Sequence, residues 1–311
     1  MSMPARSRTF LAVAVVGGAL LAWLALAALR ADPASTYHAF KVWHFNVCGN
    51  KCHTGNDTAD DSTDPVRAIY NSLTSGDPPP KAASLNELCR NQYDKLMSLL
   101  PDTWHGEFTV AKSPGDSDTD SLCFQDGSEH NYGNAILVRT TIAAGSRIEE
   151  PLPHAKSETR KIVCVTGEFD VHIRFCSTHI APLDTWSTDA HAKQDDQIAK
   201  VTNIVNGFTR PTVLMGDFNT DPPSDKLDRL YDSGKFDGGA TGKFEEIDQD
   251  TPSYGNTNPP CRCGASTHSS GRKIDYVFFN DGDWQHGSGF VTDTVTKSDH
   301  KILRGEITLV H

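Results

Sequence analysis

The chain has 311 residues, of which 37% are hydrophobic and 22% are charged, which is enough apolar material for a sizeable folded core. Its formal net charge of −11 excludes a global basic field and argues against a nucleic-acid-binding module that works by electrostatics alone. A nuclease is not excluded, because a bound metal ion can supply positive charge locally.

The N-terminal segment has the pattern of an export signal. Two arginines precede the apolar run Phe10–Leu29, which contains an Ala-Leu-Ala cleavage site near its end. A run of about 20 apolar residues can also span a bilayer, so an uncleaved anchor is the alternative. We expect residues 1–31 to be a signal peptide or signal anchor and residues 32–311 to form one domain, secreted or anchored facing outside the cytoplasm.

After this segment, short β-type runs alternate with a few helical patterns. In chain order we expect a strand at Lys41–Val47, helices at Pro65–Leu73 and Arg90–Leu100, strands at Asn134–Val138, Lys161–Val165 and His172–Ser177, a helix at Ala190–Val205, and strands at Thr212–Met215, Ile274–Phe279 and Ile302–Leu309. The stretches His53–Asp64, Ser113–Ser121 and Thr251–Arg272 are polar and loop-like. This pattern predicts an α/β (α+β) domain of two packed sheets with outer helices.

Eight cysteines in an exported chain favour disulfides. A zinc site is a poor alternative, because the two close pairs lack a matching second pair at zinc-ligand spacing. Sequence does not fix the connectivity. Our working set of disulfides is Cys48–Cys52, Cys89–Cys123, Cys164–Cys176 and Cys261–Cys263.

Six short segments place polar side chains at or just past the ends of apolar runs. They are Phe45-Asn46-Val47, Asn86-Glu87-Leu88, Ser177-Thr178-His179, Gly216-Asp217-Phe218-Asn219, Lys273-Ile274-Asp275-Tyr276 and Ser298-Asp299-His300. Strand ends that meet at one rim of a sheet sandwich would bring these side chains together. Each segment alone has an ordinary explanation, such as a surface acid or a turn, so the inference depends on all six occurring in one chain.

The residue types in these segments suit metal-assisted phosphoryl hydrolysis. Hard cations such as Mg²⁺, Mn²⁺ and Ca²⁺ prefer carboxylate and amide oxygens, which several of the segments provide. Two histidines, His179 and His300, can exchange protons or donate hydrogen bonds to a phosphate. Asp275 could hold one of them in the required tautomer and favour its charged form.

In this order the six segments resemble the endonuclease/exonuclease/phosphatase superfamily, which includes deoxyribonuclease I, abasic-site endonucleases, neutral sphingomyelinases and inositol-polyphosphate phosphatases. The matching segments run from Phe45 to His300, and Tyr132–Leu137 also resembles a segment common in that superfamily. The resemblance implies a four-layer sandwich in which two packed, mostly antiparallel β-sheets are flanked by helices, as in deoxyribonuclease I.

The resemblance also implies roles for the metal and water ligands. Glu87 would be the principal metal ligand, helped by Asn46, and Asp299 would lie beside the metal. Asp217 and Asn219 would orient or deprotonate the attacking water and contact the phosphate. The implied cofactor is Mg²⁺, with Mn²⁺ or Ca²⁺ as alternatives.

Further roles follow for the proton-transfer and substrate groups. The resemblance pairs Asp275 with His300 as base or phosphate donor, and His179 would stabilise the transition state or assist the leaving group. Asn134 and Arg90 are the expected substrate contacts. Deoxyribonuclease I-like nucleases carry an arginine two positions after the metal-binding glutamate, whereas Arg90 lies one position further on.

The leading interpretation is an extracellular, metal-dependent phosphoesterase that uses activated water, with DNA as the first substrate. It would be a monomer without an obligate protein partner. The alternatives are a sphingomyelinase- or phospholipase C-like diesterase acting on lipid headgroups and a catalytically silent binding member of the fold. Plasmid degradation and choline-phosphate release distinguish the two enzyme activities.

Overall fold

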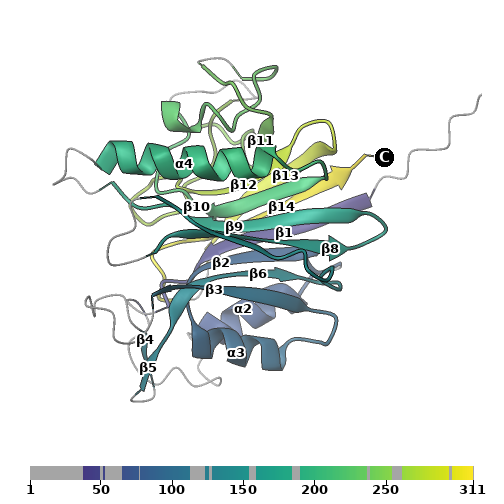
Figure 1. The fold of residues 1–311 in the computed structure, drawn as a ribbon, viewed down its shortest axis with the longest axis vertical. Coiled ribbons are helices and arrows are strands. Elements are labelled where there is room, and N and C mark those ends of the chain that lie inside the picture. The colour runs from purple at the N-terminus through teal and green to yellow at the C-terminus, as the bar shows by residue number, and fades with distance from the viewer. Residues whose placement is uncertain are drawn as a thin grey trace, which may run out of the picture. The chain divides into compact units, whose positions relative to one another are not determined.

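The computed structural model in Figure 1 describes residues 38–49, 52, 65–76, 78–112, 123–125, 128–153, 159–183, 190–236, 239–253, 261–293 and 296–310. The predicted export segment and the predicted loops His53–Asp64 and Ser113–Ser121 lie outside these residues. Among the described helices, none combines the length and apolar character needed to span a membrane. Residues His38–Val310 form one compact unit.

Within the described residues, strands outnumber helices. The helices are α2 (Pro65–Thr74), α3 (Arg90–Leu99), α4 (Ala190–Asn206) and the 3₁₀ turn η2 (Asp225–Leu227). The strands are β1 (His38–Asn46), β2 (Ala82–Cys89), β3 (His105–Lys112), β4 (Cys123–Gln125), β5 (Ser128–His130), β6 (Tyr132–Val138), β7 (Ile148–Pro151), β8 (Lys161–Glu168), β9 (His172–His179), β10 (Thr212–Asp217), β11 (Phe244–Glu246), β12 (Asp275–Asn280), β13 (Trp284–Thr292) and β14 (Ile302–Leu309).

Most strands belong to two six-stranded mixed sheets. The first sheet has the order β13-β14-β1-β2-β6-β3 and the second has the order β11-β12-β10-β9-β8-β7, while β4 and β5 form a separate small ribbon. The pairs β1–β2 and β9–β10 are parallel, and the other pairings are antiparallel. The predicted deoxyribonuclease I-like sandwich of two mostly antiparallel sheets is therefore confirmed.

Side chains alternate between the two faces of each strand, and this alternation produces the layers of the sandwich. In β1, Phe40 and Val42 belong to the core between the sheets, whereas Trp43 and Phe45 belong to the cluster that α2 and α3 cover. On the second sheet, Leu214 and Phe278 belong to the outer cluster that includes residues of α4. In Figure 1, α2 and α3 lie on one side of the stacked sheets and α4 lies on the other.

Strand direction brings the predicted site residues to one rim. Asn46 ends β1 and is opposite Asn86 of the parallel strand β2. In the second sheet, Asp217 ends β10 and is opposite both His179, the last residue of β9, and Asp275, the first residue of β12. The expectation that strand ends bring these polar segments together is met.

All four working disulfides are present: Cys48–Cys52, Cys89–Cys123, Cys164–Cys176 and Cys261–Cys263. The third joins directly opposite residues of β8 and β9. The fourth lies in the described part of the predicted Thr251–Arg272 loop. Two of the four lie near the rim, since Cys48 follows β1 and Cys89 ends β2.

Candidate active site

Three non-glycine residues at the rim adopt a left-handed backbone. These are Cys48, Glu87 and Asn219, with φ of 51°, 57° and 51°, and in the described ranges no other non-glycine residue has a positive φ. Such a conformation costs on the order of 1–3 kcal/mol and persists where the surrounding structure enforces it. Glu87 and Asn219 are predicted site residues and Cys48 lies two positions after another, Asn46, so the backbone strain coincides with the polar cluster.

A β-bulge explains how Glu87 reaches the cluster. The register between β2 and β6 shifts between Leu85 and Leu88, so two residues are released from the ladder. Glu87 is 24% exposed at its side chain, whereas Asn86 is fully buried. Asn86 Nδ2 donates to Asn134 Oδ1 (3.1 Å), and Asn86 Oδ1 accepts from the Asp217 N–H (2.9 Å). The bulge therefore ties the two sheets together beneath Glu87.

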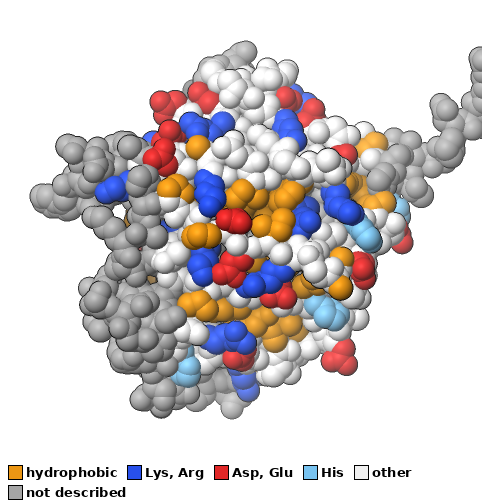
Figure 2. Space-filling model, viewed as in Figure 1, with side chains coloured by type: hydrophobic (Ala, Val, Ile, Leu, Met, Phe, Trp, Pro, Cys, Tyr) orange, Lys and Arg blue, Asp and Glu red, His pale blue; other side chains and the backbone are white. Residues whose placement is uncertain are grey.

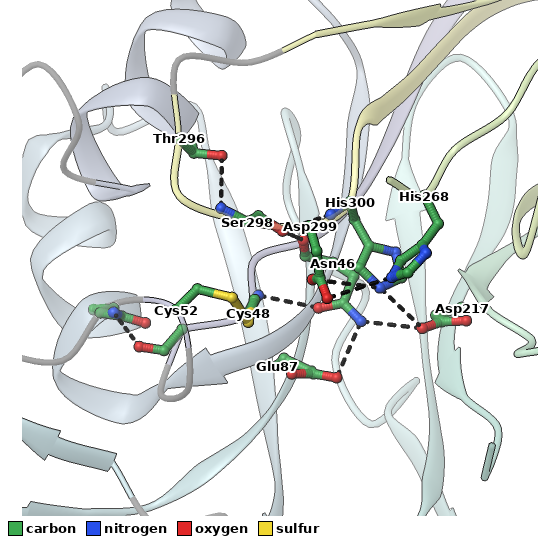
Figure 3. Close-up of a disulfide and its surroundings, with 12 residues drawn as sticks. Asn46, Cys48, Cys52, Glu87, Asp217, His268, Thr296, Ser298, Asp299 and His300 are labelled. Atoms are coloured by element: carbon green, nitrogen blue, oxygen red, sulfur yellow. Dashed lines mark hydrogen bonds and ion pairs between the residues drawn. A yellow bond between two sulfur atoms is a disulfide. The ribbon is translucent and has the colours of Figure 1, made fainter. Parts of the chain in front are cut away.

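The Asn46 amide bridges two carboxylates. Its Nδ2 donates to Glu87 Oε1 at 3.2 Å and to Asp217 Oδ2 at 3.1 Å, while its Oδ1 accepts from the Cys48 N–H at 3.1 Å. Figure 3 shows this amide between the two acids. The electropositive NH₂ group thus lies between oxygen donors that a hard cation also favours, and the donor set fits a Mg²⁺-type ion.

Asp217 depends on a close approach of β9 and β10. A Cβ at Gly216 would lie 2.1 Å from the Thr178 carbonyl oxygen, so only glycine fits there. Asp217 Oδ1 accepts from the Asn219 N–H at 2.8 Å. Burial, with the negative charge of Asp275 nearby, raises the pKa of Asp217 to about 7.

His179 is buried beside both acids. Its Nε2 lies 3.5 Å from Asp217 Oδ2, 3.8 Å from Glu87 Oε1 and 3.4 Å from Asn219 Nδ2. Burial and the positive charge of Arg160 hold its pKa well below the usual value, which favours a neutral ring. Its Nδ1 has no hydrogen-bond partner among the described residues.

Asp275 accepts hydrogen bonds from two histidines. Its Oδ2 is 2.8 Å from His300 Nδ1 and its Oδ1 is 3.0 Å from His44 Nε2. Burial opposes the charge of His300, but the Asp275 carboxylate and its hydrogen bond outweigh burial and raise the pKa of His300 to about 10. Burial likewise opposes the charge of Asp275, but His300 and His44 hold the Asp275 pKa below its usual value. An imidazolium–carboxylate pair therefore lies under the rim.

His44 extends this pair into the core and was not among the predicted site residues. Its Nδ1 lies 3.1 Å from Ser84 Oγ, which lies 2.7 Å from Ser177 Oγ. Burial lowers the pKa of His44, so the ring that orients Asp275 is neutral. The sequence signal for it is the alternation on β1, in which Val42, His44 and Asn46 share the inward face.

Ser298 fixes the C-terminal segment of the cluster. Its Oγ donates to the Asn46 carbonyl oxygen at 2.8 Å and accepts from the His300 N–H at 3.0 Å. The next residue, Asp299, is 51% exposed at its side chain, and its Oδ1 lies 4.0 Å from His300 Nε2. His268, also absent from the predicted set, lies next to His300, with the ring centroids 4.7 Å apart, and its Nε2 is 3.3 Å from Asp299 Oδ2.

The two expected substrate contacts lie further from this cluster. Asn134 is buried in β6, where it meets Asn86. Arg90 begins α3, where its Nε donates to Asp94 Oδ1 at 2.9 Å and its guanidinium lies 5.5 Å from the Tyr93 ring centroid. The other predicted site residues, from Asn46 to His300, converge on one rim. The substrate roles of Asn134 and Arg90 stay predictions.

Solved structures with a similar fold come from several organisms. An endonuclease/exonuclease/phosphatase from Beutenbergia cavernae is 17% identical with a TM-score of 0.60, and the match covers 87% of this chain and 72% of that one. The human Nocturnin catalytic domain with bound sulfate is 15% identical with a TM-score of 0.60, covering 88% and 97%. ANGEL2, a 2′,3′-cyclic phosphatase solved with adenosine-2′,3′-vanadate, is 13% identical with a TM-score of 0.56, covering 89% and 99%.

Sequence comparison adds the family. No curated protein matches the chain closely. The Endonuclease/Exonuclease/phosphatase family matches residues 43–300, a span that includes the whole polar cluster from Asn46 to His300. This chain therefore belongs to the Endonuclease/Exonuclease/phosphatase family, and its fold and family support the activity of a phosphoric ester hydrolase.

Proposed function

We propose that this protein is an exported, metal-dependent phosphodiesterase that attacks its substrate with activated water, and that DNA is its first substrate. One observation carries the proposal. Glu87, Asp217, His179 and the Asp275–His300 pair meet at a single rim although they come from five separate segments of the chain. Carboxylates and imidazoles in contact at this density serve phosphoryl hydrolysis well.

Glu87, with Asn46 and Asp299, would hold a Mg²⁺-type cation, which supplies charge neutralisation to the phosphate oxygens when it is bound. The Asn46 amide supports this assignment, since its NH₂ group lies 3.2 Å and 3.1 Å from oxygens of Glu87 and Asp217. Asn46 Oδ1 faces the Cys48 N–H in this arrangement, so direct ligation through that oxygen requires the amide to rotate.

We assign one of the remaining residues to the attacking water and two to the phosphate group. Asp217 is the proposed acceptor of the water proton, because Asn219 fixes one of its oxygens and the other faces the rim. His300 is the proposed hydrogen-bond donor to a phosphate oxygen, because the buried Asp275 carboxylate stabilises its charged form. His179 is the proposed second donor to the same phosphate, because its lowered pKa favours the neutral ring and its Nε2 borders both Asp217 and Glu87.

One comparison favours a nucleic-acid type of phosphoester over lipid headgroups, and DNA is proposed as the first such substrate to test. ANGEL2, whose fold is similar, was solved with adenosine-2′,3′-vanadate, a nucleoside with a phosphate-like group. The face in Figure 2 shows Lys and Arg side chains interspersed with Asp and Glu, in keeping with the net charge of −11. Attraction of a polyanion therefore has to arise locally, from the bound cation and the imidazolium of His300. Export is part of the proposal, and the four disulfides support it.

The test compares substrates with and without metal. The full chain, with disulfides intact, is incubated with supercoiled plasmid and with sphingomyelin vesicles, in Mg²⁺ and in excess chelator. We expect Mg²⁺-dependent plasmid cleavage that Glu87→Gln abolishes and Glu150→Gln, a change at an exposed acid of β7, leaves intact. Release of choline phosphate without plasmid cleavage would replace DNA by lipid as the substrate, and cleavage in chelator would refute metal dependence.

A further inference from the structure

His268, Asp299 and His300 form a compact group on two neighbouring segments. The two segments are joined by an isolated bridge between His268 and His300 and by a hydrogen bond of 2.8 Å from the Ser269 N–H to the Asp299 carbonyl oxygen. One ligand atom from each of the three side chains lies within 4.8 Å of the others. Figure 3 shows both rings beside the Asp299 carboxylate.

Both imidazoles direct the same nitrogen toward this group. His300 Nδ1 is engaged by Asp275 Oδ2 at 2.8 Å, and His268 Nδ1 is engaged by Ser270 Oγ at 2.7 Å. In each ring the Nε2 atom therefore faces Asp299. Asp275 holds His300 as a carboxylate holds a histidine ligand in metal proteins, with the tautomer and the ring orientation fixed. Ser270 fixes the orientation of the His268 ring, but its N–H also donates to His268 Nδ1 at 3.1 Å, so metal binding at Nε2 requires the ring proton to move to Nδ1, where Ser270 Oγ accepts its hydrogen bond.

We propose that His268, Asp299 and His300 bind Zn²⁺, and that Zn²⁺ bound there inhibits hydrolysis. Two imidazoles and one carboxylate are ligands for Zn²⁺ rather than for Mg²⁺. Ligands about 2.05 Å from a tetrahedral ion lie about 3.3 Å apart, and His268 Nε2 is 3.3 Å from Asp299 Oδ2. His300 Nε2, at 4.0 Å from Asp299 Oδ1, needs only a rotation of that exposed carboxylate.

The inhibitory consequence rests on the proposed function, whereas the binding site does not. Zn²⁺ would replace the proton on His300 Nε2, while Asp275 would still accept the hydrogen bond from Nδ1. His300 would then have no N–H to offer to a phosphate oxygen. Asp299, which already lies 3.3 Å from His268 Nε2, would also be engaged by Zn²⁺ and so be lost to the Mg²⁺ that Glu87 and Asn46 would hold.

Binding is measured first, without substrate. The full oxidised chain is titrated with Zn²⁺ against a chromophoric zinc chelator in the presence of Mg²⁺, and the X-ray absorption of bound zinc reports its ligands. We expect one Zn²⁺ per chain, bound by two imidazole nitrogens, and a loss of affinity of more than about tenfold in His268→Gln. Ser270→Ala, which leaves all three ligands in place, should weaken binding less.

The matched control is His286→Gln. His286 Nδ1 lies 3.3 Å from Asp250 Oδ2, so it forms a similar histidine–carboxylate pair, but the described residues bring no second imidazole into a metal-binding group with it. Its Zn²⁺ affinity should equal that of the wild type. Circular dichroism and urea unfolding of each variant separate loss of a ligand from loss of the fold.

Inhibition is measured second, by plasmid cleavage in the presence of Mg²⁺. For each variant we determine the Zn²⁺ concentration that halves its cleavage rate, relative to the rate of that variant without Zn²⁺. We expect that concentration to rise by more than about tenfold in His268→Gln and to stay unchanged in His286→Gln. Equal Zn²⁺ affinity in wild type and folded His268→Gln would overturn the site. Binding at the site without any effect on cleavage would overturn inhibition alone. A chain that cleaves no substrate would refute the proposed function and leave the binding experiment to decide the site.

Discussion

Replacing Asp275 by asparagine keeps the shape of the side chain but removes the charge that two histidines face. The amide has one acceptor oxygen, whereas Asp275 accepts from His300 at 2.8 Å and from His44 at 3.0 Å. One ring must then turn or lose its hydrogen bond, and His300 loses the partner that keeps it charged. A hydrogen bond to a charged group contributes about 1.5–3 kcal/mol. If that amount is lost from the transition state, kcat falls by about tenfold to a hundredfold.

The assay is steady-state hydrolysis of bis(4-nitrophenyl) phosphate in saturating Mg²⁺, with folding checked by circular dichroism. Asp281→Asn is the matched control, because Asp281 forms an exposed ion pair of 2.8 Å with Lys235 and lies at the surface. Its kcat should stay within about twofold of wild type, since exposed ion pairs contribute about 0–1 kcal/mol. A folded Asp275→Asn enzyme with kcat close to wild type would refute the role given to the Asp275–His300 pair.

Three further substitutions test the rest of the cluster. His179→Ala should lower kcat by about a hundredfold or more without unfolding the chain, because it removes a donor at the phosphate; a loss of only a few-fold would mean that His179 does not act on the substrate. Asn86→Ala removes the buried link between the sheets and leaves the Asp217 N–H without its 2.9 Å hydrogen-bond partner. The free energy of unfolding, measured in urea, should therefore fall by about 1–3 kcal/mol. An unchanged urea midpoint would contradict this. Gly216→Ala places a Cβ 2.1 Å from the Thr178 oxygen, so β9 and β10 must separate and the free energy of unfolding should fall by about 1–3 kcal/mol or more; wild-type stability would show that the strands can separate at no cost.

The layers were predictable from sequence because they follow from local patterns. The helices at Pro65–Thr74 and Ala190–Asn206 begin and end near the positions that their patterns indicate. The strand Ile302–Leu309 has the predicted bounds. Such signals need only neighbouring residues, and so a sheet-rich domain with outer helices can be inferred without knowledge of tertiary contacts.

Strand β2 illustrates what local patterns miss. Ala82–Cys89 contains no β-branched or aromatic residue, so its sequence does not favour a strand. It becomes one because β1 and β6 pair with it on both sides. The bulge that brings Glu87 to the cluster is likewise a consequence of strand pairing, and the local sequence of this segment does not predict it.

The site was predictable as a set of residues but not as a network. The six segments could be recognised together because each supplies a side chain with an obvious chemical use. Alternation places His44 on the inward face of β1 but does not assign it to the site, because a histidine within an apolar strand resembles a core residue and its partner Asp275 lies 231 positions away. His268 lies in a polar loop, and only the fold brings it to Asp299.

The most direct test of the central claim is Mn²⁺ binding to the full chain, followed by electron paramagnetic resonance, together with plasmid cleavage in the same samples. We predict one Mn²⁺ site that depends on Glu87 and that Mg²⁺ competes for, with cleavage rising in proportion to its occupancy. Glu87→Gln should lose both binding and cleavage, while Glu150→Gln keeps both. Mn²⁺ affinity that is equal in wild type and folded Glu87→Gln, or cleavage that persists in excess chelator, would contradict the account.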